Sequence, residues 1–324
     1  MLKGMQNFKV IFLIFSMLTV FPDRTISQTK YTDNSGQLNF SNLDSWYFHL
    51  IKESFFVGGE NVKLFQLGKE NSNNQGAAAS VTSPWSTSNV HAKILIDIAS
   101  PCVFPEPRGN GNCCRLETNI KAVHIVGLTI DALVSGAIFL GEFLEPVRST
   151  KSPEKGMNHG IPFTRRPKAV KFDYKCSPGK NRISTSSGEK KVPGPDRGEF
   201  CTILQKRWED ADGNVFAARV GGIRAFFDST DNKWIDGTTF ELKYGDMTGE
   251  PFYDPKTMGL IPAVGPMYVK NSRGKMVPLT ETKWDKADAI PTHLVMYFSS
   301  SYEGIYFTGS PESRLWVDNI SLIY

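Results

Sequence analysis

The chain has 324 residues, of which 22% are charged and 12% aromatic, and its formal net charge is +4. Without its first 27 residues this charge falls to +2, because Lys3, Lys9 and Arg24 are lost together with Asp23. Such a balance gives no electrostatic attraction to nucleic acid, so we expect no nucleic-acid partner.

The first 27 residues have the pattern of a secretory signal peptide. Lys3 and Lys9 give a positive start, residues 10–21 (VIFLIFSMLTVF) form an apolar run, and Ser27 is a small residue at the expected cleavage point. The run is shorter than the about 20 apolar residues that span a bilayer. We therefore expect an exported protein, periplasmic, secreted or on the cell surface, without a transmembrane span. An uncleaved membrane anchor is the alternative interpretation.

Strand patterns recur along the rest of the chain, and helix patterns are almost absent. Apolar residues alternate with polar ones, or form short apolar runs, at residues 62–67, 92–98, 115–120, 123–130, 215–220 and 239–244. Residues 293–299 (HLVMYFS) are apolar on both faces, which is typical of a strand deep in a sandwich. About a dozen such strands separated by Asp-Gly and Asn-Gly turns predict a two-sheet β-sandwich. We expect residues 28–324 to form it as one domain.

Five cysteines remain after the signal segment: Cys102, Cys113, Cys114, Cys176 and Cys201. Export permits disulfides, and the odd number leaves at least one thiol unpaired. Cys102 with one of the adjacent pair, and Cys176 with Cys201, are two pairings that the sequence allows. Small buried apolar residues are the other interpretation.

Five blocks carry a resemblance to a known family. They read DSWYF (44–48), SPWSTSNVHAK (83–93), SGAIFLGEF (135–143), GIPFTRRPKAVKFDYKCSPG (160–179) and SSSYEGIYFTGSPESRLWVDNISLIY (299–324). Together and in this order they resemble the putative carbohydrate metabolism domain (PCMD) family, known from exported proteins of Bacteroidota. The sequence departs from the family pattern at Ala137, where asparagine is usual, and at Cys176, where an aromatic residue is commoner.

The resemblance implies a β-jelly-roll, similar in architecture to carbohydrate-binding modules, and a function that concerns carbohydrate. A glycoside hydrolase would need two carboxylates facing across a cleft, and the sequence alone does not identify such a pair. Asp97, Asp131 and Asp173 lie in predicted strands, where a solvated strand face explains each of them. No nucleophile elbow or phosphate-cradling loop is present in the sequence, so enzymatic activity is uncertain.

Sugar binding needs aromatic rings for the apolar face of a pyranose and planar polar groups for its hydroxyls. The candidates for these roles are Trp85, Asn89, Arg165, Arg166, Tyr174 and Trp284. Parity along an extended segment favours Arg166 as the arginine that shares a face with Tyr174. Core or rim packing is the alternative for each aromatic residue, and a surface salt bridge is the alternative for the other arginine.

The closing strand changes phase at Asp318-Asn319, which either a β-bulge or a buried carboxylate would explain. A structural Ca²⁺ held by Asp318 and Asp44 is one interpretation, because calcium prefers oxygen ligands. Hydrogen bonds from backbone amides to Asp318 are the other.

Three functions follow from this sequence. The leading one is recognition of a glycan ligand by an exported jelly-roll. A glycan-acting hydrolase with an unrecognised carboxylate pair is the second, and a surface protein with a structural or adhesive role is the third.

Overall fold

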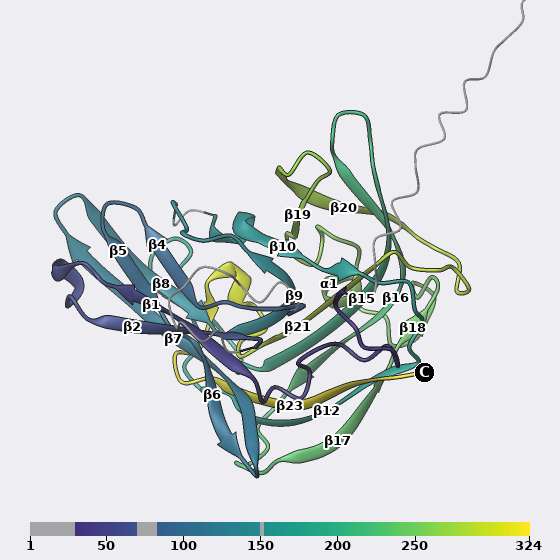
Figure 1. Ribbon diagram of the computed structural model, residues 1–324, viewed down its shortest axis with the longest axis horizontal. Helices are drawn as coiled ribbons and strands as arrows, with labels where there is room; N and C mark the ends of the chain where they lie inside the picture. The colour runs from purple at the N-terminus through teal and green to yellow at the C-terminus, as the bar shows by residue number, and fades with distance from the viewer. Residues whose placement is uncertain (1–29, 70–82, 150–151) are drawn as a thin grey trace, which may run out of the picture.

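The computed structural model describes residues 30–69, 83–149 and 152–324. The expected signal peptide lies outside the described residues. Within these ranges no helix has the length and apolarity that crossing a membrane requires. Two β-sheets pack face to face, and hairpins extend from one end of this sandwich (Figure 1). The predicted β-sandwich is therefore confirmed, whereas the jelly-roll type and the single-domain boundary at residue 28 stay predictions.

The larger sheet has ten strands. Along the sheet they are β11 (Ile161–Pro162), β21 (His293–Ser299), β15 (Gly198–Glu209), β16 (Val215–Phe227), β20 (Met276–Trp284), β19 (Tyr268–Lys270), β10 (Met157–His159), β9 (Ala137–Phe143) and β3 (Trp85–Thr87), with β18 (Lys243–Tyr244) beside β16. β21 also pairs with β9, so the strands from β9 through β10, β19, β20, β16 and β15 to β21 form a closed ring.

The second sheet has six strands: β17 (Ile235–Glu241), β12 (Ala169–Ser177), β23 (Arg314–Ile323), β7 (Gly111–Ile125), β6 (Val103–Arg108) and β8 (Leu128–Ser135). Smaller sheets are formed by β1 (Trp46–Lys52) with β2 (Asn61–Leu67), by β4 (Val90–Lys93) with β5 (Asp97–Ser100), and by β13 (Ile183–Ser184), β14 (Lys190–Lys191) and β22 (Thr308–Gly309). The helical segments are short: η2 (Phe55–Val57), η3 (Pro153–Gly156), α1 (Pro255–Met258) and η4 (Gly304–Tyr306).

Aromatic rings fill the space between the two sheets. Phe172 on β12 meets Phe200 on β15 and Phe298 on β21 at ring-centroid distances of 4.8 Å in both cases, and it stacks on Phe240 at 4.8 Å. Phe172, Phe200 and Phe298 are fully buried. Each such ring removes on the order of 150–250 Å² from water, so this cluster is a main source of stability.

β21 is apolar on both faces, as the sequence predicts, because it lies between two cores. Leu294, Met296 and Phe298 face the second sheet. Val295 and the half-buried Tyr297 pack on the other face, inside the ring of strands. This second core explains why the strand shows no alternation between polar and apolar residues.

Two of the predicted strands are hairpins in the structure, and a third, residues 239–244, is divided between β17 of the second sheet and β18 of the larger sheet. Residues 92–98 form a hairpin, with β4 ending at Lys93 and β5 beginning at Asp97. Residues 123–130 also form a hairpin, in which β7 ends at Ile125 and β8 begins at Leu128. In both cases the turn contains an exposed apolar residue, Leu95 or Val126, which continues the apolar pattern through the turn.

The bulge alternative at Asp318-Asn319 is confirmed. Between the pairs Lys171↔Ser321 and Asp173↔Asp318, β23 has one residue more than β12. Asn319 adopts φ 51°, a left-handed conformation that asparagine tolerates better than most residues. All five cysteines are buried and unpaired, so the interpretation as small apolar residues is the one that the structure supports.

Candidate functional site

A cavity of about 540 Å³ lies on the side of the larger sheet that faces away from the second sheet. Its lining comes from β9, β15, β16 and β21, and from η3, α1, η4 and residues 263–267 around them. Residues of β4, β5 and β8 line one end. Figure 1 shows these hairpins on one side of the region and β10, β19 and β20 on the other. A concavity of this size fits a small ligand.

Strand pairing places two rows of side chains across this part of the sheet. From β16 to β9, one row consists of Arg224, Cys201, Tyr297 and Phe139. The next row consists of Phe226, Glu199, Ser299 and Ala137. Because alternate residues of a strand share a face, all these side chains are on the side of the cavity.

Glu199 is the buried carboxylate of these rows. Its Oε1 accepts a hydrogen bond from Arg224 Nε at 2.6 Å and another from Tyr297 Oη at 2.7 Å. Arg224 Nη1 also donates to the Thr257 carbonyl in α1 at 3.0 Å, which fixes the guanidinium. Glu199 is 2% exposed and lines the cavity, and its Oε2 accepts no hydrogen bond from the described residues. One carboxylate oxygen is thus held in place by two donors, and the other accepts no hydrogen bond from the described residues.

Burial is the main cause of the pKa shifts of Glu199 and Tyr297. Loss of solvent raises the pKa of Glu199, whereas the charge of Arg224 and the hydrogen bond from Tyr297 lower it in part. Glu303 raises the pKa of Glu199 further by charge repulsion. Burial also raises the pKa of Tyr297 well above its ordinary value, so its hydroxyl remains a donor.

Aromatic and charged residues form the wall beside Glu199. Tyr302 meets Phe226 edge-on at a centroid distance of 5.6 Å, and the guanidinium of Arg182 lies over the Tyr302 ring at 4.3 Å. Arg182 also forms an ion pair with Glu303, which lines the cavity. Tyr306, also in the wall, is 46% exposed. Rings and hydrogen-bonding groups therefore meet in one place.

Asp196 fixes the segment that carries this wall. Its Oδ2 accepts hydrogen bonds from the hydroxyls of Ser301 and Ser313 at 2.6 Å each and from the Ser310 amide at 2.7 Å. Asp196 itself is fully buried. A Cβ at Gly304 would come within 2.7 Å of Ser135 Oγ, so η4 packs closely on β8. The wall is therefore held rigidly against the sheet.

None of the six residues predicted to bind sugar lines the cavity. Trp85 is 3% exposed and donates from Nε1 to the Asn39 carbonyl at 3.2 Å. Asn89 is fully buried and links strands through its amide: Nδ2 donates to two carbonyls, and Oδ1 accepts from the amides of Cys102 and Val103. Both side chains have their polar atoms bonded within the fold.

The two adjacent arginines contact different segments. Arg165 donates to the Ser35 carbonyl at 2.8 Å and lies over the Tyr324 ring. Arg166 donates to the carbonyls of Ala287 and Ala289 and lies 4.3 Å from the centre of the Tyr244 ring.

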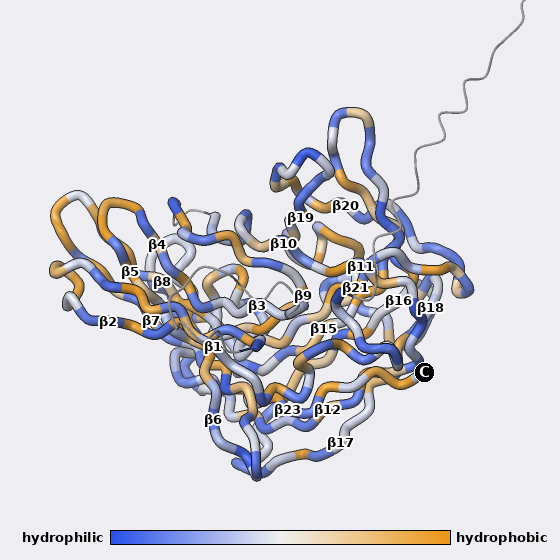
Figure 2. The backbone as a smooth tube through the Cα atoms, in the orientation of Figure 1, coloured by the Kyte–Doolittle hydropathy of each residue, from blue (hydrophilic) through white to orange (hydrophobic). Residues whose placement is uncertain are grey.

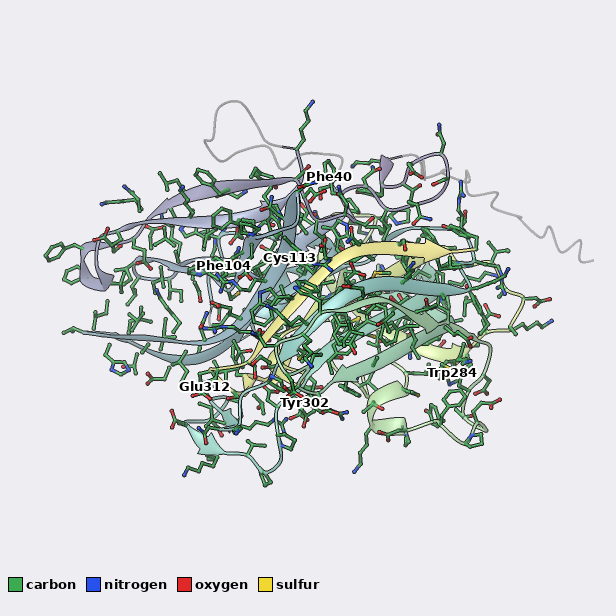
Figure 3. All side chains as sticks on the ribbon, turned by 90° about the horizontal axis from the view of Figure 1, so that it is seen from below. Phe40, Phe104, Cys113, Trp284, Tyr302 and Glu312 are labelled. Carbon is green, nitrogen blue, oxygen red and sulfur yellow. The ribbon has the colours of Figure 1, made fainter. Side chains whose placement is uncertain are left out.

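Tyr174 and Trp284 also pack against protein groups. Tyr174 stacks on Phe227 at 4.4 Å at the border of the core, so its face of β12 points inward. Trp284 meets Tyr253 edge-on and lies away from Tyr302 of the cavity wall (Figure 3). The structure does not bring the six residues together, and their ligand role stays a prediction.

The expected calcium ligands have protein partners. Asp44 accepts from the Asn112 amide at 2.9 Å and from Asn42 Nδ2 at 2.6 Å. Asp318 accepts from Arg108 Nη1 at 2.6 Å and from the Asn319 amide at 2.9 Å. Among the described residues no group of three or more His, Cys, Asp or Glu side chains is arranged to hold a metal ion. The calcium site stays a prediction.

One feature of the sequence points to the cavity, although neither the strand patterns nor the motifs do: charged residues within long apolar strands. Glu199 and Arg224 are charged residues within the long, largely buried strands β15 and β16, which also contain Arg207 and Arg219. A charge in such a strand needs a partner, and adjacent strands can supply it. The pairing itself depends on register, which the sequence does not give.

The fold and the site define a class: a two-sheet β-sandwich with a ligand-sized cavity on one outer face. The chain belongs to the family described as putative carbohydrate metabolism domain, whose sequence profile matches residues 55–242 and 276–323. The predicted resemblance is thus confirmed, and a carbohydrate-related function follows from this membership.

Two solved structures are similar to the chain. One is a putative glycoside hydrolase from Bacteroides thetaiotaomicron, with 16% identity and a TM-score of 0.47, covering 86% of this chain and 71% of that one. The other is a putative glycoside hydrolase from Bacteroides vulgatus, with 15% identity and a TM-score of 0.47, covering 81% of this chain and 91% of that one. No curated protein matches the chain.

Proposed function

We propose that the protein is an exported glycan-binding protein that takes part of a carbohydrate into the cavity above Glu199. Membership of a carbohydrate-related family supports the class of ligand. The concave site, its aromatic wall and its buried polar cluster support the place of binding.

The observation that carries this proposal is the state of the Glu199 carboxylate. It is 2% exposed, it is held at Oε1 by Arg224 and Tyr297, and its Oε2 accepts no hydrogen bond from the described residues. Glu199 lines the cavity, so a sugar hydroxyl that enters the cavity would donate a charge-assisted hydrogen bond to this oxygen. Phe226 and Tyr302 offer apolar surface for the C–H groups of the same sugar ring.

A glycan array followed by isothermal titration calorimetry tests this proposal. We expect a saccharide to bind the wild type and to bind the Glu199→Gln variant at least about tenfold more weakly, because the charged acceptor is lost. Glu241→Gln is the matched control, since Glu241 is an exposed residue of the second sheet. Absence of binding at millimolar concentrations across the array, or equal affinity of both variants, would contradict the proposal.

Glycoside hydrolysis is the second candidate function. Glu199 and Glu303 line the same cavity, and burial raises the pKa of Glu199, as a general acid requires. Incubation with a polysaccharide panel and a reducing-end assay distinguishes the two functions. Release of reducing ends that is lost in both Glu199→Gln and Glu303→Gln, but kept in Glu241→Gln, would favour hydrolysis over binding alone.

A further inference from the structure

Four large apolar side chains project into solvent at one end of the molecule. Phe55 is 88% exposed, Phe56 71%, Leu95 65% and Val126 101%. Figure 2 shows hydrophobic stretches at the free end of the hairpins that extend from the sandwich. Exposed apolar residues are common singly, but a group of four in one place indicates an interaction surface.

The four residues come from three neighbouring hairpin tips. Phe55 and Phe56 lie between β1 and β2, Leu95 lies between β4 and β5, and Val126 lies between β7 and β8. The Ser54 amide donates to the Asp97 carbonyl at 3.1 Å, which joins the first tip to the second. A Cβ at Gly127 would lie 3.7 Å from Leu95 Cδ1, so the second tip touches the third. We call these four residues the apolar tip.

The apolar tip is separate from the core that stabilises the hairpins. That core consists of Ala92, Ile98, Val123, Ile130 and Val147, with half-buried neighbours such as Ile94, Ile96 and Ile125 packed against it. The tip residues belong neither to this core nor to the lining of the cavity. Removing them would therefore leave the packing of the hairpins intact.

The size and shape of the apolar tip decide what it contacts. Its two phenylalanines carry roughly 300–500 Å² of surface, whereas a stable protein interface buries about 800 Å² on each partner. The side chains project from three turns and are 65–101% exposed, so a protein partner would need to enclose each of them. A lipid bilayer accepts separate apolar side chains into its interface without such an enclosing surface.

The charges behind the apolar tip are balanced. Three lysines, Lys52, Lys93 and Lys121, lie beside four acidic groups, Glu53, Glu60, Asp97 and Asp131, so no excess of positive charge is present. Three pairs are in contact: Lys93 with Asp97, Lys121 with Glu53, and His124 with Asp131. Attraction to anionic lipid is therefore weak, and apolar insertion is the main contribution to binding.

We propose that the protein binds the surface of a lipid bilayer by inserting Phe55, Phe56, Leu95 and Val126 into its interface. This contact would hold the exported protein at a membrane by one end and leave the cavity, on another part of the surface, free for its ligand. The inference does not depend on the proposed glycan binding.

Vesicle flotation tests the inference with the complete chain, expressed in a host that would cleave the expected signal peptide. We expect the wild type to float with phosphatidylcholine vesicles, and to do so to a similar extent with added phosphatidylglycerol or at high salt. The bound fraction of the Phe55→Ser/Phe56→Ser variant should fall at least about tenfold at equal lipid concentration.

The matched control is Phe252→Ser/Ile290→Ser, which removes two apolar residues that are 45% and 56% exposed outside the apolar tip. This control should float as the wild type does, and both variants should keep the wild-type melting temperature. No flotation of the wild type, or equal flotation of both variants, would overturn the inference. A wild-type oligomer that the Phe55→Ser/Phe56→Ser variant converts to a monomer in light scattering would also overturn it, in favour of contact between copies.

Discussion

Tyr297 on β21 donates a hydrogen bond to Oε1 of Glu199 on the neighbouring strand β15, over 2.7 Å. This bond lowers the pKa of a carboxyl group that burial raises. It also orients the carboxylate, so that Oε2 is the oxygen that we propose accepts from the glycan.

Replacing Tyr297 with phenylalanine should shift the pH dependence of glycan binding. Without the phenol donor, which lowers the pKa of Glu199, that pKa rises further. Binding that uses the ionised carboxylate should then be lost at a higher pH than in the wild type. Calorimetric titrations across pH 4–8 measure the shift. Tyr324→Phe, which removes a hydroxyl far from the cavity that bonds the Gly36 carbonyl, should leave the profile unchanged.

His159 should make the protein sensitive to acid. Burial lowers its pKa to about 4, and Nδ1 lies 3.2 Å from the Tyr268 carbonyl. The unfolded chain binds this proton near pH 6.5 and the folded chain does not, so stability is complete above pH 6.5 and falls as the pH drops toward 4. The loss from this group by pH 4 is about 3 kcal/mol.

Urea unfolding at pH 7 and pH 4 measures this contribution. The change in unfolding free energy between the two pH values should be smaller in His159→Gln than in the wild type by about that amount. His124→Gln serves as the control, since the His124 side chain is 62% exposed. An equal pH dependence of wild type and His159→Gln would show that another group causes acid sensitivity.

Asp196 should contribute strongly to the stability of the fold, because it holds the segment that forms the wall of the cavity. Asp196→Ala leaves two buried hydroxyls and one buried amide without their acceptor, which should cost about 3–5 kcal/mol of stability. Asp196→Asn keeps one acceptor oxygen and should cost less. Denaturant unfolding gives these values, and Asp228→Ala, at an aspartate whose side chain is 76% exposed, should change stability by less than about 0.5 kcal/mol.

The sequence was sufficient to predict the architecture but not its turns. Alternation at residues 115–120 and two-sided apolarity at residues 293–299 identify parts of β7 and β21, because burial in a sandwich imposes those patterns. The turns at Leu95 and Val126 escape prediction, because polar residues normally mark turns and these tips are apolar. The two turns that the sequence fails to predict therefore lie in the apolar tip, for which we propose membrane binding.

The candidate site could be predicted only in part. The sequence indicates carbohydrate through the family resemblance, but it directs attention to Arg166 and Tyr174, which contact other parts of the fold. Glu199, Arg224 and Tyr297 come from three strands separated by as many as 98 residues, and only the strand register brings them together. The sequence alone shows that these charged residues are present, but it does not show which strands pair and bring them into contact.

We predict that the guanidinium of Arg108, rather than a calcium ion, compensates the charge of Asp318. Its Nη1 lies 2.6 Å from Asp318 and 2.8 Å from Asp173, and Trp234 stacks on the guanidinium. Arg108→Met leaves both carboxylates uncompensated and should cost about 3 kcal/mol. Arg314→Met, at an arginine whose side chain is 54% exposed, should cost little. The wild-type melting temperature should be the same in calcium and in EDTA. A clear rise with calcium would instead support the metal site.

Hydrogen–deuterium exchange with a bound saccharide tests the central claim most directly, because it locates the ligand without any substitution. We predict that the saccharide slows exchange in residues 198–204, 222–227 and 297–307, which line or carry the cavity around Glu199. Protection confined to the segments around Trp85 and Arg166, with none in these three ranges, would contradict the account.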